Sequence, residues 1–201
     1  MTKSKLIVIS APSGAGKTTL CQRLLRDFPE LVRSVSTTTR APRGTEREGV
    51  DYYFVTKEQF LRQIEAKRFA EWAEVHGNYY GTSKQMIEHT FALKKSVLLA
   101  IDVQGSASLL KAFPKECYTI FIAPPSLAAL ESRLRARKTD SEEVILKRVR
   151  NAREEIKRIN EFHQVVINDQ LEPAYEELKI IVKSLLRSEM AAPAAGGQTS
   201  G

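Results

Sequence analysis

The sequence predicts an α/β fold, in which a parallel β-sheet carries helices on both of its faces. Four short runs are almost continuously apolar and rich in Val, Ile and Leu, which is typical of parallel strands that are covered on both faces. Segments with helical periodicity separate these runs, and this alternation is the pattern of a doubly wound sheet. The expected strands lie at 6–10, 97–102, 118–123 and 164–168.

Helical segments account for most of the chain between these strands. Pro29 stands just past the first of them, where it would end a helix. The helix after "KTDS" has an apolar stripe with alternating spacings of four and three residues, and Thr139 and Glu142 have the spacing of a capping box at its start. The stripe consists of Ile145, Val149, Ala152, Ile156 and Ile159. The expected helices lie at 17–27, 104–113, 126–137, 141–162 and 171–187.

Two segments interrupt the alternation. Residues 36–82 are rich in Thr, Arg, Gly and Tyr and predict a small β-rich insertion. Residues 126–163 predict two charged helices joined by "KTDS". The small, turn-prone residues 191–201 predict a disordered tail. We therefore expect a single domain over 1–190, whose core consists of 1–35, 83–125 and 164–190.

The composition is that of a soluble globular protein. The chain has 201 residues, 42% of them hydrophobic and 27% charged, which is enough for one well-buried domain. Apolar runs such as "VLLAI" are too short to cross a bilayer, and the apolar stretch near the N-terminus is too short for a secretory signal. Cys21 and Cys117 fit neither a disulfide framework nor a metal pattern. A reduced, cytoplasmic setting is therefore expected.

The net charge of +7 raises the possibility of a nucleic-acid partner. The chain contains no block of five or six like charges, however, and so has no basic arm. A modest positive field suits small anionic substrates equally well. We therefore expect small-molecule substrates, no nucleic acid and no membrane partner; both a monomer and a homo-oligomer are compatible with the sequence.

The segment after the first strand resembles a phosphate-binding loop. It matches the pattern G-x-x-x-x-G-K-[ST], except that Ala11 occupies the first glycine position. Gly14 and Gly16 let the backbone approach a phosphate closely, and the N-terminus of the following helix attracts negative charge. Lys17 would reach the β- and γ-phosphates of a nucleotide, and the Thr18 hydroxyl would bind Mg²⁺. The loop comprises Ala11, Pro12, Ser13, Gly14, Ala15, Gly16, Lys17, Thr18 and Thr19.

Ala11 would disable this loop only if its position required a positive φ, because a Cβ is strained there. Pro12 argues against such a requirement. The residue before a proline is pushed toward extended geometry with negative φ, which alanine tolerates. We therefore expect a working loop.

The insertion offers ligands for a second phosphate and for a base. Arg40 and Arg43, three residues apart, together with the hydroxyls of Tyr52 and Tyr80, can clamp a phosphate away from the loop. Ser36, Glu71 and Thr82 could read a base. A carboxylate fits guanine, whose N1–H and 2-amino group point the same way, whereas the N1 acceptor of adenine would be repelled.

At these residues the sequence closely resembles the guanylate kinases. The matching blocks are "SAPSGAGKTT", "SVSTTTRAPRGTEREGVDYYFV", "FAEWAEVHGNYYGTS", "LLAIDVQG", "RLRARKTDSEEVILKR" and "VVIND", in the order and at the spacing of the family. The resemblance covers about residues 4–187, and this ordered set is far more specific than the loop alone. It implies a P-loop NTPase-type fold with a GMP-binding insertion at 36–82 and a helical lid at 126–163.

The resemblance implies the reaction ATP + GMP ⇌ ADP + GDP with Mg²⁺ and residues 11–19 at the ATP, with dGMP as a further expected acceptor. Arg40, Arg43, Tyr52 and Tyr80 would then bind the GMP phosphate, and Ser36, Glu71 and Thr82 the guanine. Asp102 would lie near the metal and GMP, Arg137 and Arg148 on the lid would contact the phosphates, and Asn168 would lie beside the adenine. The residues implied in catalysis are Lys17, Arg40, Asp102, Arg137 and Arg148.

Two other functions remain open at this point. A guanylate-kinase-like domain that has lost catalysis and binds protein partners would typically have lost loop or acceptor residues, but this chain keeps Lys17, Thr18 and Glu71. A P-loop kinase for another small acceptor, such as AMP, is disfavoured by Glu71.

Overall fold

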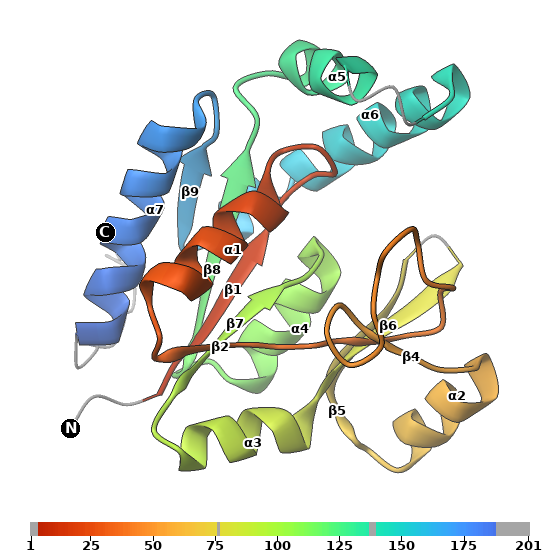
Figure 1. The fold of residues 1–201 in the computed structure, drawn as a ribbon, viewed down its shortest axis with the longest axis vertical. Helices are drawn as coiled ribbons and strands as arrows, with labels where there is room; N and C mark the ends of the chain where they lie inside the picture. The colour runs from red at the N-terminus through yellow and green to blue at the C-terminus, as the bar shows by residue number, and fades with distance from the viewer. Residues whose placement is uncertain (1–3, 76, 137–139, 188–201) are drawn as a thin grey trace, which may run out of the picture.

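The core of the structure is a five-stranded sheet in which all neighbouring strands are parallel. The computed structural model describes residues 4–75, 77–136 and 140–187 (Figure 1). The strand order is β2-β7-β1-β8-β9, so the first strand lies at the centre and the chain crosses over between the two halves of the sheet. The prediction of a parallel α/β fold is confirmed. The strands are β1 (Leu6–Ser10), β2 (Leu31–Arg33), β7 (Ser96–Ala100), β8 (Cys117–Ala123) and β9 (Gln164–Ile167).

Helices cover both faces of this sheet. α1 (Lys17–Asp27) and α7 (Leu171–Arg187) pack on one face, against a cluster that includes Ile7, Ile9 and Ile120. α3 (Lys84–Ala92) and α4 (Val103–Ala112) pack on the other face, against Leu6 and Val8. Successive residues of β1 therefore enter different cores, and all of them are buried. This two-sided burial explains the continuously apolar strands of the sequence.

The insertion forms a second, four-stranded sheet of order β4-β3-β6-β5 beside the core (Figure 1). Its elements are β3 (Thr37–Thr38), β4 (Tyr53–Phe54), α2 (Lys57–Glu65), β5 (Phe69–Val75) and β6 (Asn78–Ser83). The sequence reading did not separate α2 from the β-rich segment, although Thr56 and Gln59 form a capping box at its start. Phe60 of α2 packs on Phe69 and Tyr79 of this sheet, with ring centroids 4.5 and 5.4 Å apart.

The lid segment contains α5 (Leu127–Ala136) and α6 (Glu142–Ile156), which lie beyond the carboxyl ends of the central strands (Figure 1). Ile145 and Ala152 of the predicted apolar stripe are buried. The prediction of one helix over 141–162 was too long, because α6 ends at Ile156 and a separate 3₁₀ turn (Ile159–Glu161) follows. Ser141 caps α6 through a hydrogen bond from Val144 N to its Oγ (3.5 Å), so the predicted capping box was misplaced; Thr139 lies outside the described residues.

In the described parts of the chain, no helix is long and apolar enough to cross a membrane. Cys21 and Cys117 are both buried and unpaired, as their spacing indicated.

Candidate active site

The loop between β1 and α1 encloses a cavity of about 370 Å³. Gly14 and Gly16 have φ angles of 99° and 93°, which are strained for residues with a Cβ, and they bend the backbone around this space. The cavity faces the N-terminus of α1, whose dipole favours a negative group there. Its lining consists of Ala11, Pro12, Ser13, Gly14, Gly16, Lys17, Thr18, Thr19, Asp102 and Glu155.

Ala11 causes no strain in this loop. Among the described residues, Lys67 and Lys94 are the non-glycine residues with positive φ, so Ala11 lies outside the region that demands glycine. Its side chain is buried, 7% exposed, against the core. The negative φ that Pro12 predicts for Ala11 is therefore confirmed, and the working loop stays a prediction.

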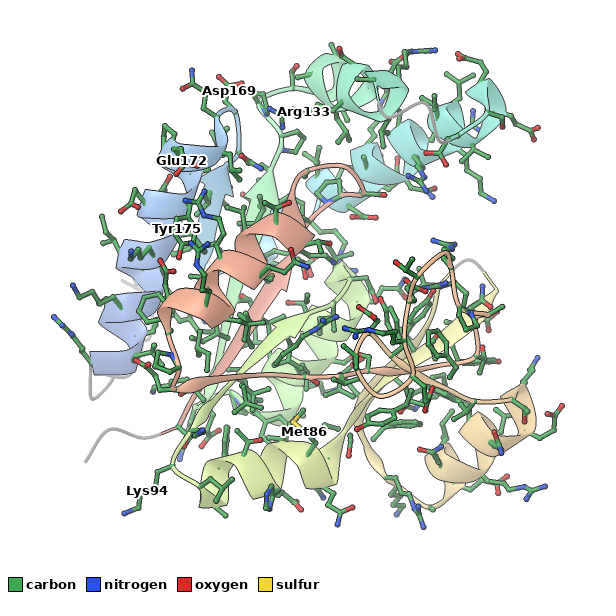
Figure 2. All side chains as sticks on the ribbon, in the orientation of Figure 1. Met86, Lys94, Arg133, Asp169, Glu172 and Tyr175 are labelled. Atoms are coloured by element: carbon green, nitrogen blue, oxygen red, sulfur yellow. The ribbon has the colours of Figure 1, made fainter. Side chains whose placement is uncertain are left out.

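Asn168, just after β9, holds the phosphate loop through a side-chain hydrogen bond. Its Nδ2 donates a hydrogen bond to the Ala15 carbonyl (2.7 Å), and a Cβ added to Gly16 would collide with that same nitrogen. Arg133 of α5 donates to the carbonyl oxygens of Asn168 and Asp169, both at 2.7 Å, and Figure 2 shows Arg133 and Asp169 together at the top of β9. Glycine is thus required at position 16 both by its φ and by the space left for Asn168.

The Lys17 amine lies at the junction of the loop and the central strands. Its Nζ donates to the Ile101 carbonyl (3.1 Å), just beyond β7. Burial lowers its pKa from the usual value, while the carboxylates of Glu155 and Asp102 oppose this shift. A lysine that is removed from water in this way gains most from an incoming phosphate.

Two carboxylates, Asp102 and Glu155, border the same cavity. The predicted strand 97–102 ends at Ala100, and Asp102 is instead the N-cap of α4, where its Oδ1 accepts from Gln104 N (2.7 Å) and Gly105 N (3.2 Å). Burial raises the pKa of Glu155 to about 7, although Lys17 pulls it down. Sequence reasoning missed Glu155. Its signal was the seven-residue spacing from Arg148, which places both on one face of α6.

The cavity offers oxygen ligands rather than a preformed metal cage. No group of three or more His, Cys, Asp or Glu residues in the described ranges could hold a metal ion. The Thr18 hydroxyl, Asp102 and Glu155 supply the hard oxygens around the loop. Mg²⁺ keeps several waters and binds with substrate phosphates plus one or two protein oxygens, so this donor set fits it.

Arg40 is the centre of a second group, formed by the insertion. It is buried (8% exposed) and donates to the Tyr80 hydroxyl (3.2 Å), to the Ala41 carbonyl (2.7 Å) and to Glu46 (2.9 Å). Its guanidinium carbon lies 5.4 Å from the centroid of the Tyr52 ring. Arg40, Tyr52 and Tyr80 are therefore brought together as predicted.

Glu46 connects Arg40 to the backbone of Arg43, and the sequence analysis did not identify it as a site residue. It accepts from both Arg40 and the backbone N–H of Arg43 (2.8 Å). Burial opposes the shift, but these hydrogen bonds hold its pKa below the usual value. The exposed Arg43 is thus positioned through its backbone. The signal was an acid three residues after an arginine in a turn that carries Gly44 (φ 53°).

Glu71 and Thr82 form the third group, at adjacent positions of β5 and β6. Thr82 Oγ1 donates to Glu71 Oε1 (2.6 Å), and both side chains are buried. Burial raises the pKa of Glu71 to about 7, Thr82 opposes this, and Asp102 adds to it. A Cβ on Gly105 would lie 2.8 Å from Glu71 Oε2, so α4 can approach the carboxylate only because position 105 is glycine. Ser36 lines a neighbouring cavity of about 160 Å³ that also contains Lys17 and Tyr52.

Lys17 of the loop and Ser36 and Tyr52 of the insertion line one cavity, and Glu71 lies beside Gly105 of α4. The sequence model of the family "Guanylate kinase" matches residues 3–185. The chain belongs to the guanylate kinase family. The chain is therefore an enzyme of the nucleoside monophosphate kinase class.

Individual guanylate kinases agree with this assignment. A guanylate kinase of Anaeromyxobacter dehalogenans is 51% identical over 89% of this chain and 79% of the relative. One of Myxococcus xanthus is 49% identical over 88% of this chain and 85% of the relative. The crystal structure of guanylate kinase from Anaplasma phagocytophilum superimposes with a TM-score of 0.78 at 32% identity, covering 94% of this chain and 89% of that one.

Two predicted site residues, Arg137 and Arg148, belong to none of the three groups described above. Arg148 Nη1 lies 3.1 Å from Asp140 Oδ2, so in this structure it pairs within the lid segment. Arg137 lies outside the described residues. The contacts of these two arginines with the phosphates stay a prediction.

Proposed function

We propose that this guanylate kinase transfers the γ-phosphoryl group of Mg-ATP to GMP, giving ADP and GDP. The observation that carries the choice of acceptor is the buried Glu71 carboxylate, which accepts a hydrogen bond from Thr82 and lies beside Gly105 of α4. The ionised carboxylate accepts hydrogen bonds from N1–H and the 2-amino group of guanine. AMP offers neither donor and would leave a buried charge unpaired, which is costly.

ATP would bind at the phosphate loop. Most residues of the loop at 11–19, Lys17 among them, line the cavity in which its β- and γ-phosphates would lie. Thr18 would hold Mg²⁺, which supplies charge neutralisation across the two phosphates when it is bound. Asn168 and Arg133 keep the loop in shape, and the segment at Asn168 would border the adenine.

GMP would bind between the insertion and the end of the sheet. Its phosphate carries the negative charge that Arg40 and Arg43 attract, and the hydroxyls of Tyr52 and Tyr80 can donate to it. Ser36 and Thr82 would complete the contacts to guanine beside Glu71. None of these residues is assigned to the 2′-hydroxyl of the ribose. We therefore expect dGMP to be an acceptor as well.

Transfer then requires positioning and charge stabilisation rather than a covalent intermediate. Lys17 and Arg40 would stabilise the negative charge of the reacting phosphates, and Asp102 would orient the groups around the metal. Closing of the lid at 126–163 would bring Arg137 and Arg148 to the phosphates, once Arg148 leaves Asp140. It would also exclude water, which competes with GMP as acceptor.

We also propose that the chain forms a single domain at 1–190, with a core, a GMP-binding insertion at 36–82 and a lid at 126–163. The enzyme would act in the cytoplasm on small molecules, without a nucleic-acid or membrane partner.

The test is ADP production from Mg-ATP with GMP, AMP, UMP and CMP offered separately, with a control that lacks an acceptor. Turnover with GMP alone is the expected result. Equal turnover with AMP would remove Glu71 from its role as the base reader. A folded protein that phosphorylates none of them would instead support a catalytically silent domain that binds protein partners.

A further inference from the structure

Ser34, just beyond the end of β2, has a buried hydroxyl without a partner in the protein. Among the buried side-chain N and O atoms of the described residues, Ser34 Oγ is the one that makes no hydrogen bond within the chain. The residue is 8% exposed, and its backbone N–H donates to the Leu98 carbonyl (2.9 Å), so the sheet fixes its position. An unpaired buried hydroxyl destabilises a fold, and alanine would serve packing better.

Ser34 lines the cavity of about 160 Å³ that lies between the phosphate loop and the insertion. Lys17 and Thr18 form one wall of this cavity, and Ser36 and Tyr52 of the insertion form another. Arg33, the other cation that lines this cavity, is already paired with Asp51. Its Nη2 donates to the Asp51 carbonyl (3.4 Å), and its Nη1 lies 3.9 Å from the Asp51 carboxylate. The cavity therefore joins the loop that would hold the donor phosphates to the residues that would hold the acceptor phosphate.

We propose that Ser34 Oγ donates a hydrogen bond to a phosphate oxygen of the acceptor nucleotide. This inference rests on the proposed function, because it takes GMP as the acceptor. A serine hydroxyl is both donor and acceptor, and a phosphate oxygen is a strong charged acceptor. Lys17, Tyr52 and Ser34 line the same cavity, and an acceptor phosphate placed there would meet the donor phosphates at the loop. The unpaired hydroxyl destabilises the ligand-free protein, and the phosphate of the bound substrate supplies its hydrogen-bond partner.

The variant Ser34→Ala separates this role from a structural one. Loss of a hydrogen bond to a charged group should weaken GMP binding by about tenfold or more. Binding of guanosine, which has the base and ribose but no phosphate, should not change. The thermal midpoint of the ligand-free protein should stay the same or rise, because no hydrogen bond of the fold is lost.

Ser96→Ala is the matched control. Ser96 is equally buried (6% exposed), but its Oγ accepts from Lys5 N (3.0 Å) at the opposite end of the sheet. This variant should lower the thermal midpoint and leave the dissociation constant of GMP unchanged. The two serines thus predict opposite patterns of stability and affinity.

The experiment measures calorimetric binding of GMP and guanosine to wild type, Ser34→Ala and Ser96→Ala, with thermal unfolding of each ligand-free protein. Unchanged GMP affinity in Ser34→Ala would overturn the inference and leave water as the partner of the hydroxyl. An equal loss for guanosine would also overturn it, because the contact would then be to base or ribose. If wild type itself neither binds nor phosphorylates GMP, the proposed function fails, which is a different result.

Discussion

Glu71 and Glu155 are buried carboxylates whose pKa values lie near neutrality, and the main cause in both is loss of water around the charge. For Glu71 the folded-state pKa of about 7 stands above the ordinary glutamate value of 4.5. The folded protein therefore holds more protons than the unfolded chain between these values, and the stability that Glu71 contributes falls as the pH rises through this window. Above about pH 7 the full cost of the buried charge is present.

This titration gives GMP binding a pH dependence. A protonated Glu71 has lost one of the acceptor positions that guanine requires, so the affinity for GMP should fall as the pH drops below about 7. In Glu71→Gln, the affinity should be lower by roughly ten- to a hundredfold, since a charged hydrogen bond is lost, and should no longer follow this titration. Dissociation constants of GMP between pH 5.5 and 8.5 test both statements.

Exchange of the exposed Glu74 of the same strand for Gln is the control and should leave the profile unchanged. In addition, Glu71→Gln should raise the free energy of unfolding relative to wild type at pH 8 by up to about 3 kcal/mol, with a smaller gain at pH 5. A gain that is the same at both pH values would contradict the raised pKa.

At the scale of elements, contacts between helices and loops hold the phosphate loop in shape. Asn168 after β9 fastens the Ala15 carbonyl, and Arg133 of α5 fastens the backbone of Asn168 in turn. On the other side of α1, Arg23 forms a bidentate pair with Glu172 of α7 (2.7 Å) and stacks on Tyr175 (4.1 Å). Figure 2 labels Glu172 and Tyr175 on the side of α7 that faces α1.

Gly16→Ala should damage both the loop and its support. The positive φ costs about 1–2 kcal/mol with a Cβ, and the new methyl group also displaces Asn168. Gly44→Ala is the matched variant, because Gly44 also has a positive φ (53°) but open space around it. Thermal unfolding and ATP binding of both proteins should show a larger loss for Gly16→Ala. Equal losses would mean that the contact with Asn168 carries no energy.

Tyr175→Phe tests the junction of α1 and α7. The Tyr175 hydroxyl donates to Asp27 Oδ2 (2.7 Å), and together with Lys179 and Arg26 it holds the pKa of Asp27 well below its usual range. Stability from a lowered carboxyl pKa is present above the unfolded value and is lost as the pH falls toward the folded one. The variant should therefore unfold at a lower temperature than wild type at pH 7, by about 2–6 °C, with a smaller difference near pH 3. A constant difference would exclude the Asp27 contact as its cause.

At the scale of the whole molecule, the sequence predicted what depends on local pattern. β1 and α1 have the predicted bounds because an apolar run, two glycines and Pro29 mark their limits locally. β2 was missed because it is a three-residue edge strand with little apolar signal. α2 and α3 were missed because short strands surround them in a segment dominated by turn and strand residues.

The site shows the same division. Lys17, Arg40 and Glu71 could be predicted because each stands within a motif of fixed spacing. Glu46, Glu155 and Ser34 were missed. Spacing alone does not separate Glu46 and Glu155 from ordinary exposed acids, because the importance of all three residues comes from burial and from partners that only the fold brings near them. The surroundings of a side chain, rather than its type, separate these residues from their neighbours.

The most direct test of the account is the product balance of one reaction mixture that contains Mg-ATP and GMP, followed by chromatography of all nucleotides. Wild type should form GDP and ADP in equal amounts, and Lys17→Ala should form neither while keeping its fold, because the amine that meets the β- and γ-phosphates is gone. ADP without GDP would show that water, not GMP, receives the phosphoryl group, and would contradict the central claim.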